Sequence, residues 1–274
     1  MNGRKVINKE LITKGFVTGI IKGGFGNQMF IIFTSLSYAI DNDLNHSVFL
    51  REKKRKSYFN TPLYRKLNTF ACKAKIFQEN CFEYKKIPDG MKNVILSGYF
   101  QSWKYFHHNK EKILDYMGLK QLIQDTLGKY DNYLENTATL HFRLGDYKNL
   151  TQYHALVDIS YYKNALKKIE KSSKVLYFFE DEDRQEVSNK IKILQEENPE
   201  MVFTPIDTGI VDWEQVLIMS GIKDNIIANS TFSWWGAYLS DIPDKKIIYP
   251  STWFGPRMSN KNTHDLFFEH WIKI

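Results

Sequence analysis

The stretch 137-TATLHFRLGDY-147 decides the fold prediction, because it begins as a strand and ends in a charged turn. Its first residues are mostly β-branched or apolar, and Gly145 ends the run. Arg143, at the carboxyl end of this strand, is costly to bury without an anionic partner. Ligands of open α/β sheets lie at that same end of the strands. The stretch therefore predicts either an arginine that binds phosphate or, as the alternative, a surface ion pair between Arg143 and Asp146.

Downstream of this stretch, apolar runs of strand length alternate with segments of helical periodicity. Such alternation predicts a parallel sheet built from right-handed βαβ units. The apolar tail 266-LFFEHWIKI-274 is expected to dock as a helix. Strands are expected at 137–143, 174–180, 201–203, 225–229 and 246–249, and helices near 160–171, 183–196, 212–221 and 231–240.

Upstream, the strand 16-FVTGII-21 is followed by the glycine-rich turn 22-KGGFGNQMF-30 and an apolar run to Ile40. A strand, a glycine turn and a helix are typical of a mononucleotide-binding unit, because glycines let backbone N–H groups approach an anion. The alternative is a tight turn without a ligand. Asn27 and Gln28 at the helix start either cap the helix or bond a sugar or phosphate.

An aromatic and polar segment, 98-GYFQSWKYF-106, follows a strand within 93–103. Rings beside amides suit a carbohydrate site, although such clusters also form the edge of a core. The region 51–92 has no sustained period and is expected to hold helices and loops. We place a domain boundary near Glu135, so that α/β domains at 1–135 and 136–274 face each other across a cleft.

Composition narrows the class of protein further. The chain has 274 residues, 43% of them hydrophobic and 25% charged, and its two cysteines form neither a disulfide framework nor a zinc motif. The net charge is +7, with much of the excess between 51 and 75. This basic patch is either a solvated face or a contact for an anionic partner, including peripheral contact with a membrane. No nucleic-acid-binding motif accompanies it, so nucleic acid is not an expected partner.

The first 20 residues lack the apolar core of a signal peptide, and the apolar stretch 29–40 is too short to span a bilayer. A soluble, cytoplasmic protein is expected.

Four segments together make the chain resemble the inverting α-1,2-fucosyltransferases, which transfer fucose from GDP-fucose to a sugar acceptor. These segments are 23-GGFGNQMF-30, 98-GYFQSWKYF-106, 141-HFRLGDY-147 and 229-NSTFSWWGAYL-239. The resemblance implies a GT-B-type fold of two Rossmann-like domains, with an N-terminal acceptor-side domain and a C-terminal domain that binds the GDP-sugar. It also implies that no metal or other cofactor is needed.

The resemblance assigns Arg143 to the diphosphate of the donor, where a guanidinium stabilises the charge that grows as phosphate leaves. His141 projects to the same side of the strand and either contacts the nucleotide, orients Arg143 or is a buried structural histidine. The helix start at Ser230 and Thr231 offers an N-cap and hydroxyls for phosphate. Trp234 and Trp235 are expected to pack this helix onto the sheet.

In 180-EDED-183, Asp181 is the candidate for reading guanine; the alternative is that Asp181 and Asp183 cap a helix.

Inversion at the sugar carbon needs an acceptor hydroxyl as nucleophile, and Asp146 is either its general base or the residue that holds Arg143. The expected acceptor is O2 of a galactose in a glycan. Other readings are transfer of another GDP-sugar or linkage, and a glycan-binding protein without turnover. The remaining candidates are Gly24, Gly26, Asn27 and Gln28 for the donor, and Gln101 and Trp103 for the acceptor.

Overall fold

The computed structural model describes residues 14–50, 58–69, 74–169 and 174–274. Its internal contacts divide the chain into two compact units. The first consists of Met1–Lys120 with Thr263–Phe267, and the second of Gln121–Asn262 with Phe268–Ile274. The change of unit thus falls earlier in the chain than the boundary at Glu135 expected from the sequence. Both units have parallel sheets with helices packed on them, so the α/β class is confirmed.

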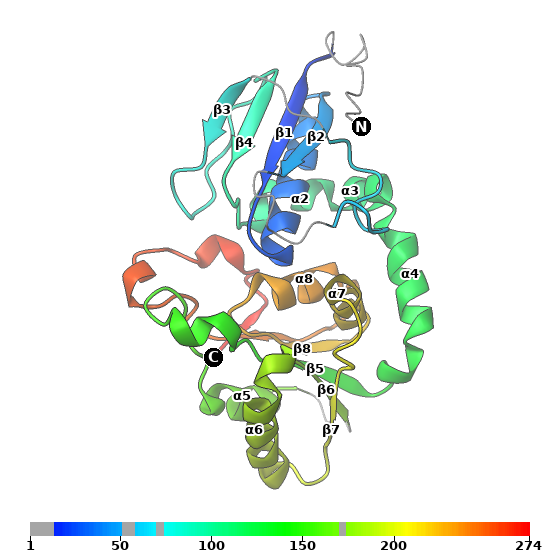
Figure 1. The fold of residues 1–274 in the computed structure, drawn as a ribbon, viewed down its shortest axis with the longest axis vertical. Helices are drawn as coiled ribbons and strands as arrows, with labels where there is room; N and C mark the ends of the chain where they lie inside the picture. Colours follow the sequence, from blue (N-terminus) through cyan, green and yellow to red (C-terminus); the bar gives the residue numbers. More distant parts are fainter. Residues whose placement is uncertain (1–13, 51–57, 70–73, 170–173) are drawn as a thin grey trace. The chain divides into compact units, whose positions relative to one another are not determined.

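The first unit is organised on a four-stranded parallel sheet in the order β2-β1-β4-β3 (Figure 1). Strand β1 pairs with β2 on one side and with β4 on the other. The carboxyl end of β1 is therefore the point where the strand order reverses, which is where ligands bind in open sheets. The strands are β1 (Phe16–Ile21), β2 (Asn45–Leu50), β3 (Lys75–Gln78) and β4 (Val94–Ser97).

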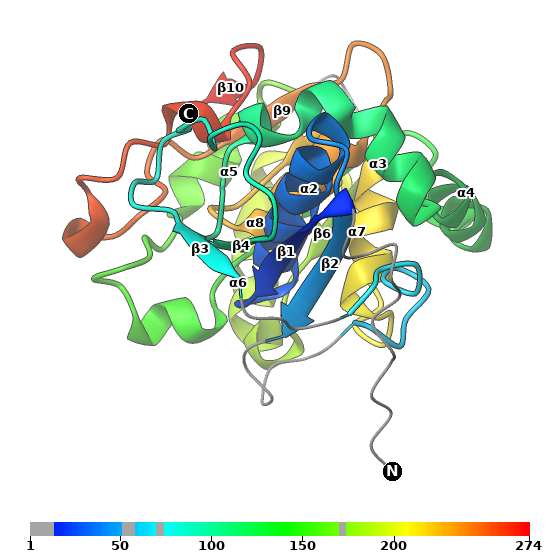
Figure 2. The ribbon, with the colours of Figure 1, turned by 90° about the horizontal axis from the view of Figure 1, so that it is seen from above.

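Helix α2 (Phe25–Asp41) packs against β1 and β2 (Figure 2). Every residue from Phe25 to Ala39 is buried except Asn27, which lies in the first turn. A helix that is apolar on all sides belongs in a core, so α2 is the central helix of its unit. The expected helix start after the glycine turn is confirmed.

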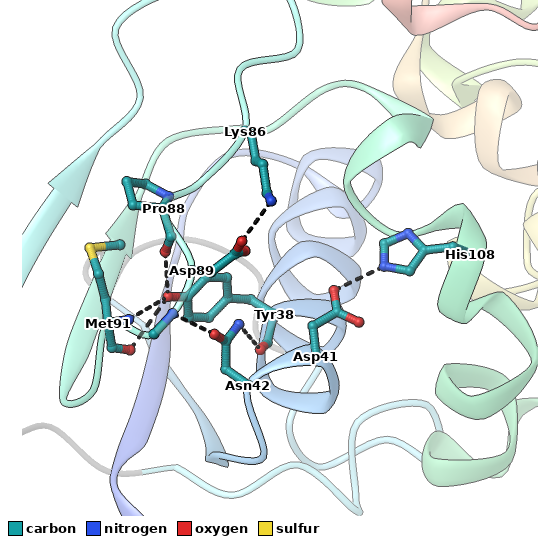
Figure 3. Close-up of polar contacts among 9 residues, drawn as sticks. Tyr38, Asp41, Asn42, Lys86, Pro88, Asp89, Met91 and His108 are labelled. Carbon is teal, nitrogen blue, oxygen red and sulfur yellow. Dashed lines mark hydrogen bonds and ion pairs between the residues drawn. The ribbon is translucent and has the colours of Figure 1, made fainter.

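A polar network fastens the chain before β4 to the last turns of α2 (Figure 3). The hydroxyl of Tyr38 donates to the carbonyl of Pro88 at 2.7 Å and accepts the N–H of Met91 at 3.1 Å. The side-chain oxygen of Asn42 accepts the N–H of Gly90 at 2.7 Å. These bonds lie at the carboxyl end of α2, and therefore at the edge of the sheet opposite to the ligand edge. The network is structural.

The expectation of helices and loops for 51–92 was wrong for Lys75–Gln78, which is strand β3 at the edge of the sheet. Three of its four residues are exposed, including Ile76, so the strand has no buried face to give an alternating pattern. The unit also contains short 3₁₀ turns at Trp103–Tyr105 and His107–Asn109 and helix α3 (Lys110–Met117).

The second unit has a six-stranded sheet in the order β10-β9-β8-β5-β6-β7, and every pairing in it is parallel. Strand β5 lies between β8 and β6, with His141 opposite Phe178. The strands are β5 (Thr137–His141), β6 (Lys174–Phe178), β7 (Val202–Pro205), β8 (Asp224–Ile226), β9 (Ile247–Tyr249) and β10 (Ile272–Lys273).

Helices cover both faces of this sheet, α5 and α6 on one side and α7 and α8 on the other (Figure 1). All five residues of β5 are buried, because the strand is central and has helices above and below. The helices are α4 (Leu119–Lys129), α5 (Ile159–Leu166), α6 (Arg184–Glu197), α7 (Asp212–Ser220) and α8 (Thr231–Leu239).

The tail was expected to dock as a helix, and this was wrong. Its last residues form β10 beside β9, with Ile272 opposite Ile248, and Trp271 is buried. An apolar run of this length fits a buried strand as well as a helix, so its hydrophobicity alone could not decide.

Candidate functional site

Arg143 leaves the sheet two residues after β5 ends, at the carboxyl edge of the second unit. The N–H of Phe142 still bonds to the carbonyl of Phe178 at 2.8 Å, which keeps the chain beside β6. Only 17% of the Arg143 side chain is exposed. The guanidinium is thus held in the protein surface at the edge where the sequence predicts a ligand.

Two carboxylates and one ring surround this guanidinium. Nη2 of Arg143 donates to Oδ1 of Asp146 at 2.5 Å, and Nη1 lies 2.5 Å from Oε1 of Glu180. The guanidinium also lies over the ring of Tyr147, 4.6 Å from its centre. Burial disfavours the charge on Arg143, but Glu180, Tyr147 and Asp146 outweigh it and raise its pKa above the ordinary value. The ion pair between Arg143 and Asp146 is therefore present, and the guanidinium is permanently charged.

Tyr147 extends this arrangement toward the next loop. Its ring stacks on His154 with centres 4.1 Å apart and planes 11° from parallel. Its hydroxyl donates to the carbonyl of Asn229 at 3.4 Å, and the Asn229 amide donates to the carbonyls of Ala155 and Trp253. The motif that carries Arg143 and the motif that begins at Asn229 are thereby joined.

Asp183 anchors the turn that carries Arg143. Its carboxylate is buried and accepts the backbone N–H of Gly145 at 2.6 Å, and it pairs with Lys148 at 2.6 Å. Asp183 occupies the N-cap position of α6 but makes no side-chain cap bond there. Asp183 therefore stands at the N-cap position that the sequence allowed for it, but its oxygens bond to the neighbouring turn and not to the helix.

His141 is held as a structural residue in this structure. Its Nδ1 lies 2.9 Å from Oγ of Ser233 at the start of α8, and its ring leans on Phe232. Burial, with a smaller effect of the Arg143 charge, lowers the pKa of His141 to about 3. A neutral imidazole that joins β5 to α8 fixes the edge from which Arg143 projects.

The start of α8 matches its predicted role as a helix cap. Ser230 is the N-cap, and its hydroxyl accepts the N–H of Phe232 at 3.3 Å. Thr231 follows as the first helical residue and is half-buried. Trp234 and Trp235 are fully buried and pack among aromatic rings, so the expectation that they hold the helix in place is confirmed.

Asp181 lies away from Arg143 in its contacts. Its carboxylate accepts both Nε and Nη2 of Arg184 and the hydroxyl of Thr208, and 67% of its side chain is exposed. The bond with Arg184 lowers the pKa of Asp181, so the group stays ionised. The structure thus leaves Asp181 as an exposed anion on the rim of the same sheet edge.

In the first unit, the predicted glycine turn lies at the carboxyl end of β1. Gly24 is the N-cap of α2, in extended conformation and with open space around it, and Gly26 is buried in the first turn. Gln28 is buried and donates to the carbonyl of Gly23 at 3.1 Å. Asn27 accepts a 2.7 Å hydrogen bond from the side chain of Gln101.

This last bond joins two motifs that are far apart in the chain. Gln101 comes from the turn after β4, a strand that pairs with β1, so both motifs lie at one edge of the sheet. Trp103 donates its indole N–H to the carbonyl of Phe267 at 3.2 Å. Asn27 and Gln101 are therefore neighbours, whereas the polar group of Trp103 has a structural use.

The turn before Gln101 is strained. Phe100 has a φ of 52° although its ring is fully buried, and Glu79 accepts the N–H groups of both Tyr99 and Phe100. Tyr99 remains partly exposed, with Lys22 Nζ 4.4 Å from its ring centre. The Glu79 carboxylate thus fixes the aromatic segment at the ligand edge of the first unit.

Sequence reasoning missed Glu180 and Tyr147 as neighbours of Arg143, and Asp183 as the residue that anchors its turn. The parallel pairing of β5 and β6 brings the turns after both strands together, so the acidic run after β6 was the available signal. Within the described residues, no three His, Cys, Asp or Glu side chains are arranged to hold a metal ion.

Of the basic patch at 51–75, Arg65, Lys66 and Lys75 are exposed, while 51–57 and Lys73 lie outside the described residues. No helix in the described part of the chain has both the length and the apolar character to cross a membrane.

A family model described as "Glycosyl transferase family 11" matches residues 21–274. The chain is 27% identical to an alpha-1,2-colitosyltransferase of Escherichia coli, over 94% of this chain and 98% of that protein. It is 28% identical to the O-antigen biosynthesis glycosyltransferase WbnK of Escherichia coli, over 65% of this chain and only 60% of WbnK.

Two solved structures share the fold. The NodZ alpha-1,6-fucosyltransferase of Bradyrhizobium, co-crystallized with GDP, gives a TM-score of 0.51 at 11% identity and covers 83% of this chain and 93% of its own. The ADP-heptose LPS heptosyltransferase II of E. coli gives 0.52 at 11% identity, over 94% of this chain and 89% of its own. At such identities the likeness concerns the fold alone, which is the expected GT-B type with parallel α/β sheets.

Proposed function

Because the chain belongs to glycosyl transferase family 11, we propose that it transfers a fucosyl group from GDP-fucose to a hydroxyl of a glycan acceptor. The acceptor hydroxyl is O2 of a galactose, the configuration at the transferred carbon is inverted, and no metal is required. The second unit binds the donor, and the first unit binds the acceptor.

The observation that carries this proposal is the placement of the Arg143 guanidinium. It is charged, mostly buried and fixed at the carboxyl edge of a parallel sheet, between Asp146 and Tyr147. A planar guanidinium donates parallel hydrogen bonds to phosphate oxygens, and its attraction grows as negative charge collects on the departing diphosphate. Binding that strengthens in the transition state accelerates the transfer.

GDP as the leaving group is supported by the family and by the GDP-bound relative in fold. In this proposal Thr231 and the N-cap Ser230 meet phosphate at the α8 start, since free N–H groups of a helix start favour anions. Asp181 receives the guanine edge, as an ionised and exposed acceptor. His141 fixes the end of β5 to the start of α8 through its bond with Ser233, without touching the nucleotide.

For Asp146, two roles follow from one position. Its carboxylate already bonds to Arg143, and 62% of the side chain is exposed toward solvent. As a holder, it keeps the guanidinium plane fixed; as a general base, it takes the proton of the acceptor hydroxyl. We propose the holder role as the primary one, because the carboxylate already accepts a hydrogen bond from the guanidinium.

In the first unit, the acceptor candidate Gln101 donates a hydrogen bond to the donor candidate Asn27, at the carboxyl ends of β4 and β1. Their amides suit sugar hydroxyls, and the partly exposed ring of Tyr99 lies on the same turn as Gln101. Trp103 lines this segment through its ring, since its N–H is already bonded. Gly24, Gly26 and Gln28 lie on the same turn as Asn27 and are, with it, candidates for contact with the donor.

A second donor is favoured by one specific observation. The relative that aligns over 94% of this chain is named for transfer of a colitosyl group. Transfer of colitose from a GDP-linked donor uses the same diphosphate contacts, so Arg143 serves both donors. The groups that contact the sugar ring would decide between them.

The test is a transfer assay with purified protein, a panel of galactosides, and either GDP-fucose or GDP-colitose. GDP release is followed together with the mass of the glycan product, with and without EDTA. We expect a glycan that gains one fucosyl group, at a rate that EDTA does not change. Equal GDP release without any acceptor would indicate hydrolysis, and binding of galactosides without turnover would identify a glycan-binding protein.

A further inference from the structure

The acidic turn after β6 touches the Arg143 turn at two places that differ in kind. Strands β5 and β6 pair in parallel up to His141 and Phe178, so the two turns begin side by side. Asp183 provides one contact, and Glu180 provides the other. Asp183 is buried and bonded to the backbone, whereas half of the Glu180 side chain is exposed.

The contact made by Glu180 is close but poorly aligned. Its Oε1 lies 2.5 Å from Nη1 of Arg143. Nη1 is nevertheless a buried donor without a hydrogen-bond partner among the described residues, because its N–H groups do not point along the line to the carboxylate. Asp146, by contrast, accepts an aligned hydrogen bond from Nη2. One side of the guanidinium is therefore satisfied, and the other is only neutralised.

Glu180 is also poorly stabilised as an anion. Burial raises its pKa, Arg143 offsets part of this effect, and Asp146, Asp183 and Glu182 raise it again. A carboxylate in this position is attracted by one guanidinium and repelled by three acids. Breaking this contact therefore costs little free energy when an anion that bonds more favourably to Arg143 takes its place.

The chain nevertheless makes room for this carboxylate. Gly145 has a φ of 33°, and a Cβ atom built there would lie 2.0 Å from Oε2 of Glu180. Only glycine lets the Arg143 turn pass this close to Glu180. The approach of Glu180 to the guanidinium is thus a property of both turns.

We propose that Glu180 is an exchangeable counter-ion that occupies Nη1 of Arg143 in the free protein and is displaced by the diphosphate of the nucleotide. This inference rests on the proposed function, and it names the group with which the donor competes. Two diphosphate oxygens then accept the N–H groups of Nη1 and give it the aligned hydrogen bonds that it lacks, while Asp146 stays on Nη2. Glu180 turns to solvent and no longer repels the neighbouring acids.

The alternative is that Glu180 is a permanent brace for Arg143. The two roles predict opposite effects of Glu180→Gln, which keeps the size of the side chain and removes its charge. Loss of a competitor strengthens nucleotide binding, whereas loss of a brace weakens it. Glu186→Gln is a matched control, because Glu186 lies in the same cluster and, in the described part of the chain, pairs with Lys148 and Lys190 and not with Arg143.

The experiment is calorimetric titration of the full chain and both variants with GDP, GMP and guanosine at one ionic strength. For GDP, we expect the Kd of Glu180→Gln to be about three- to fivefold lower than that of the native chain, the size of a partly exposed ion pair. Glu186→Gln should change it by less than about twofold. Guanosine, which has no phosphate, should bind all three proteins equally.

Each outcome decides a separate point. Weaker GDP binding by Glu180→Gln overturns the exchange. An equal change of the Kd for GDP in Glu186→Gln and Glu180→Gln overturns it as well. Weaker binding of guanosine as well as GDP would place Glu180 on the base and also overturns it. If the native chain binds no GDP, the proposed function fails and the inference fails with it. In transfer assays the exchange predicts a lower KM for the donor in Glu180→Gln.

Discussion

The backbone N–H of Gly145 donates a 2.6 Å hydrogen bond to the buried carboxylate of Asp183, which lies in the turn after the neighbouring strand. This bond fixes the position of the Arg143 turn relative to the turn after β6. The same carboxylate pairs with Lys148, so the turn is held at both its start and its end. The direction of the Arg143 side chain therefore depends on a residue that does not touch it.

Asp183→Ala should lower kcat by at least about tenfold, because a displacement of the order of 1 Å in a catalytic group costs about that much or more. The unfolding free energy should fall by about 1–3 kcal/mol, since the Gly145 N–H loses its acceptor in a buried site. Asp183→Asn retains an oxygen for Gly145 and should recover part of the kcat. Transfer kinetics and urea unfolding measure both effects; an unchanged kcat in a cooperatively folded Asp183→Ala protein would contradict the positioning role.

Arg143→Lys should cost nearly as much as Arg143→Ala, at least about 100-fold in kcat/KM. A lysine keeps the charge but loses the planar pair of donors and the contact with Tyr147. The control is Arg257→Ala, which removes an exposed arginine that contacts Tyr153 in the same unit. Steady-state kinetics with the donor varied give the comparison. A rate close to native in Arg143→Lys would mean that charge alone is sufficient.

The sequence predicted the second unit well because its central strands β5 and β8 are buried along their whole length and its helices have one apolar side. The exit of Arg143 from β5 and the cap at Ser230 followed from local patterns of this kind. Asp183 and Glu180 could not be assigned, because their roles depend on which turns lie side by side, and this is set by strand order. Asp181 and Asp183 are the same residue type two positions apart, yet Asp181 is exposed and Asp183 is buried.

In the first unit, the segment before β4 shows a different limit. Strand β3 is short and exposed, so its residues carry no alternation that a sequence pattern could reveal. Glu79, just beyond it, fixes the Tyr99 turn by accepting two backbone N–H groups. Nothing local distinguishes this glutamate from its exposed neighbours, because its partners are 20 and 21 residues away.

Acid should destabilise each unit through one buried histidine. Burial lowers the pKa of His46 to about 3, and burial with the Arg143 charge lowers that of His141 to about 3. The unfolded chain takes up these protons near pH 6.5, so the stabilisation is complete above that pH and is lost as the pH falls toward 3. The loss per histidine is up to about 1.4 kcal/mol for each pH unit in that window.

Urea unfolding at several pH values between 7 and 5 measures this slope. His46→Gln should make the dependence on pH shallower, because one titrating group is removed. A native slope in the His46 variant would show that His46 is protonated in the folded chain.

Asn27 and Gln101 should behave as a coupled pair. Their 2.7 Å hydrogen bond joins the glycine turn to the aromatic segment, and Gln101 is buried. A double-mutant cycle of Asn27→Ala and Gln101→Ala should give a coupling energy of about 0.5–1.5 kcal/mol in unfolding. In transfer assays Gln101→Ala should raise the KM of the acceptor more than that of the donor. If the two substitutions had additive effects on the unfolding free energy, the bond would not couple the two motifs.

Gly145→Ala should inactivate the protein through its contact with Glu180. The added Cβ would lie 2.0 Å from Oε2 of Glu180 and 3.1 Å from Nη1 of Arg143, so one of the two turns must move. We expect kcat/KM to fall by about 100-fold, since the guanidinium shifts with its turn. Glu180→Ala in the same chain removes the closest atom and should restore part of the activity, although the φ of 33° still disfavours alanine. Transfer kinetics of both single variants and the double variant provide the measurement. Activity of Gly145→Ala equal to native, or no gain from the second substitution, would show that the approach of Glu180 does not constrain the Arg143 turn.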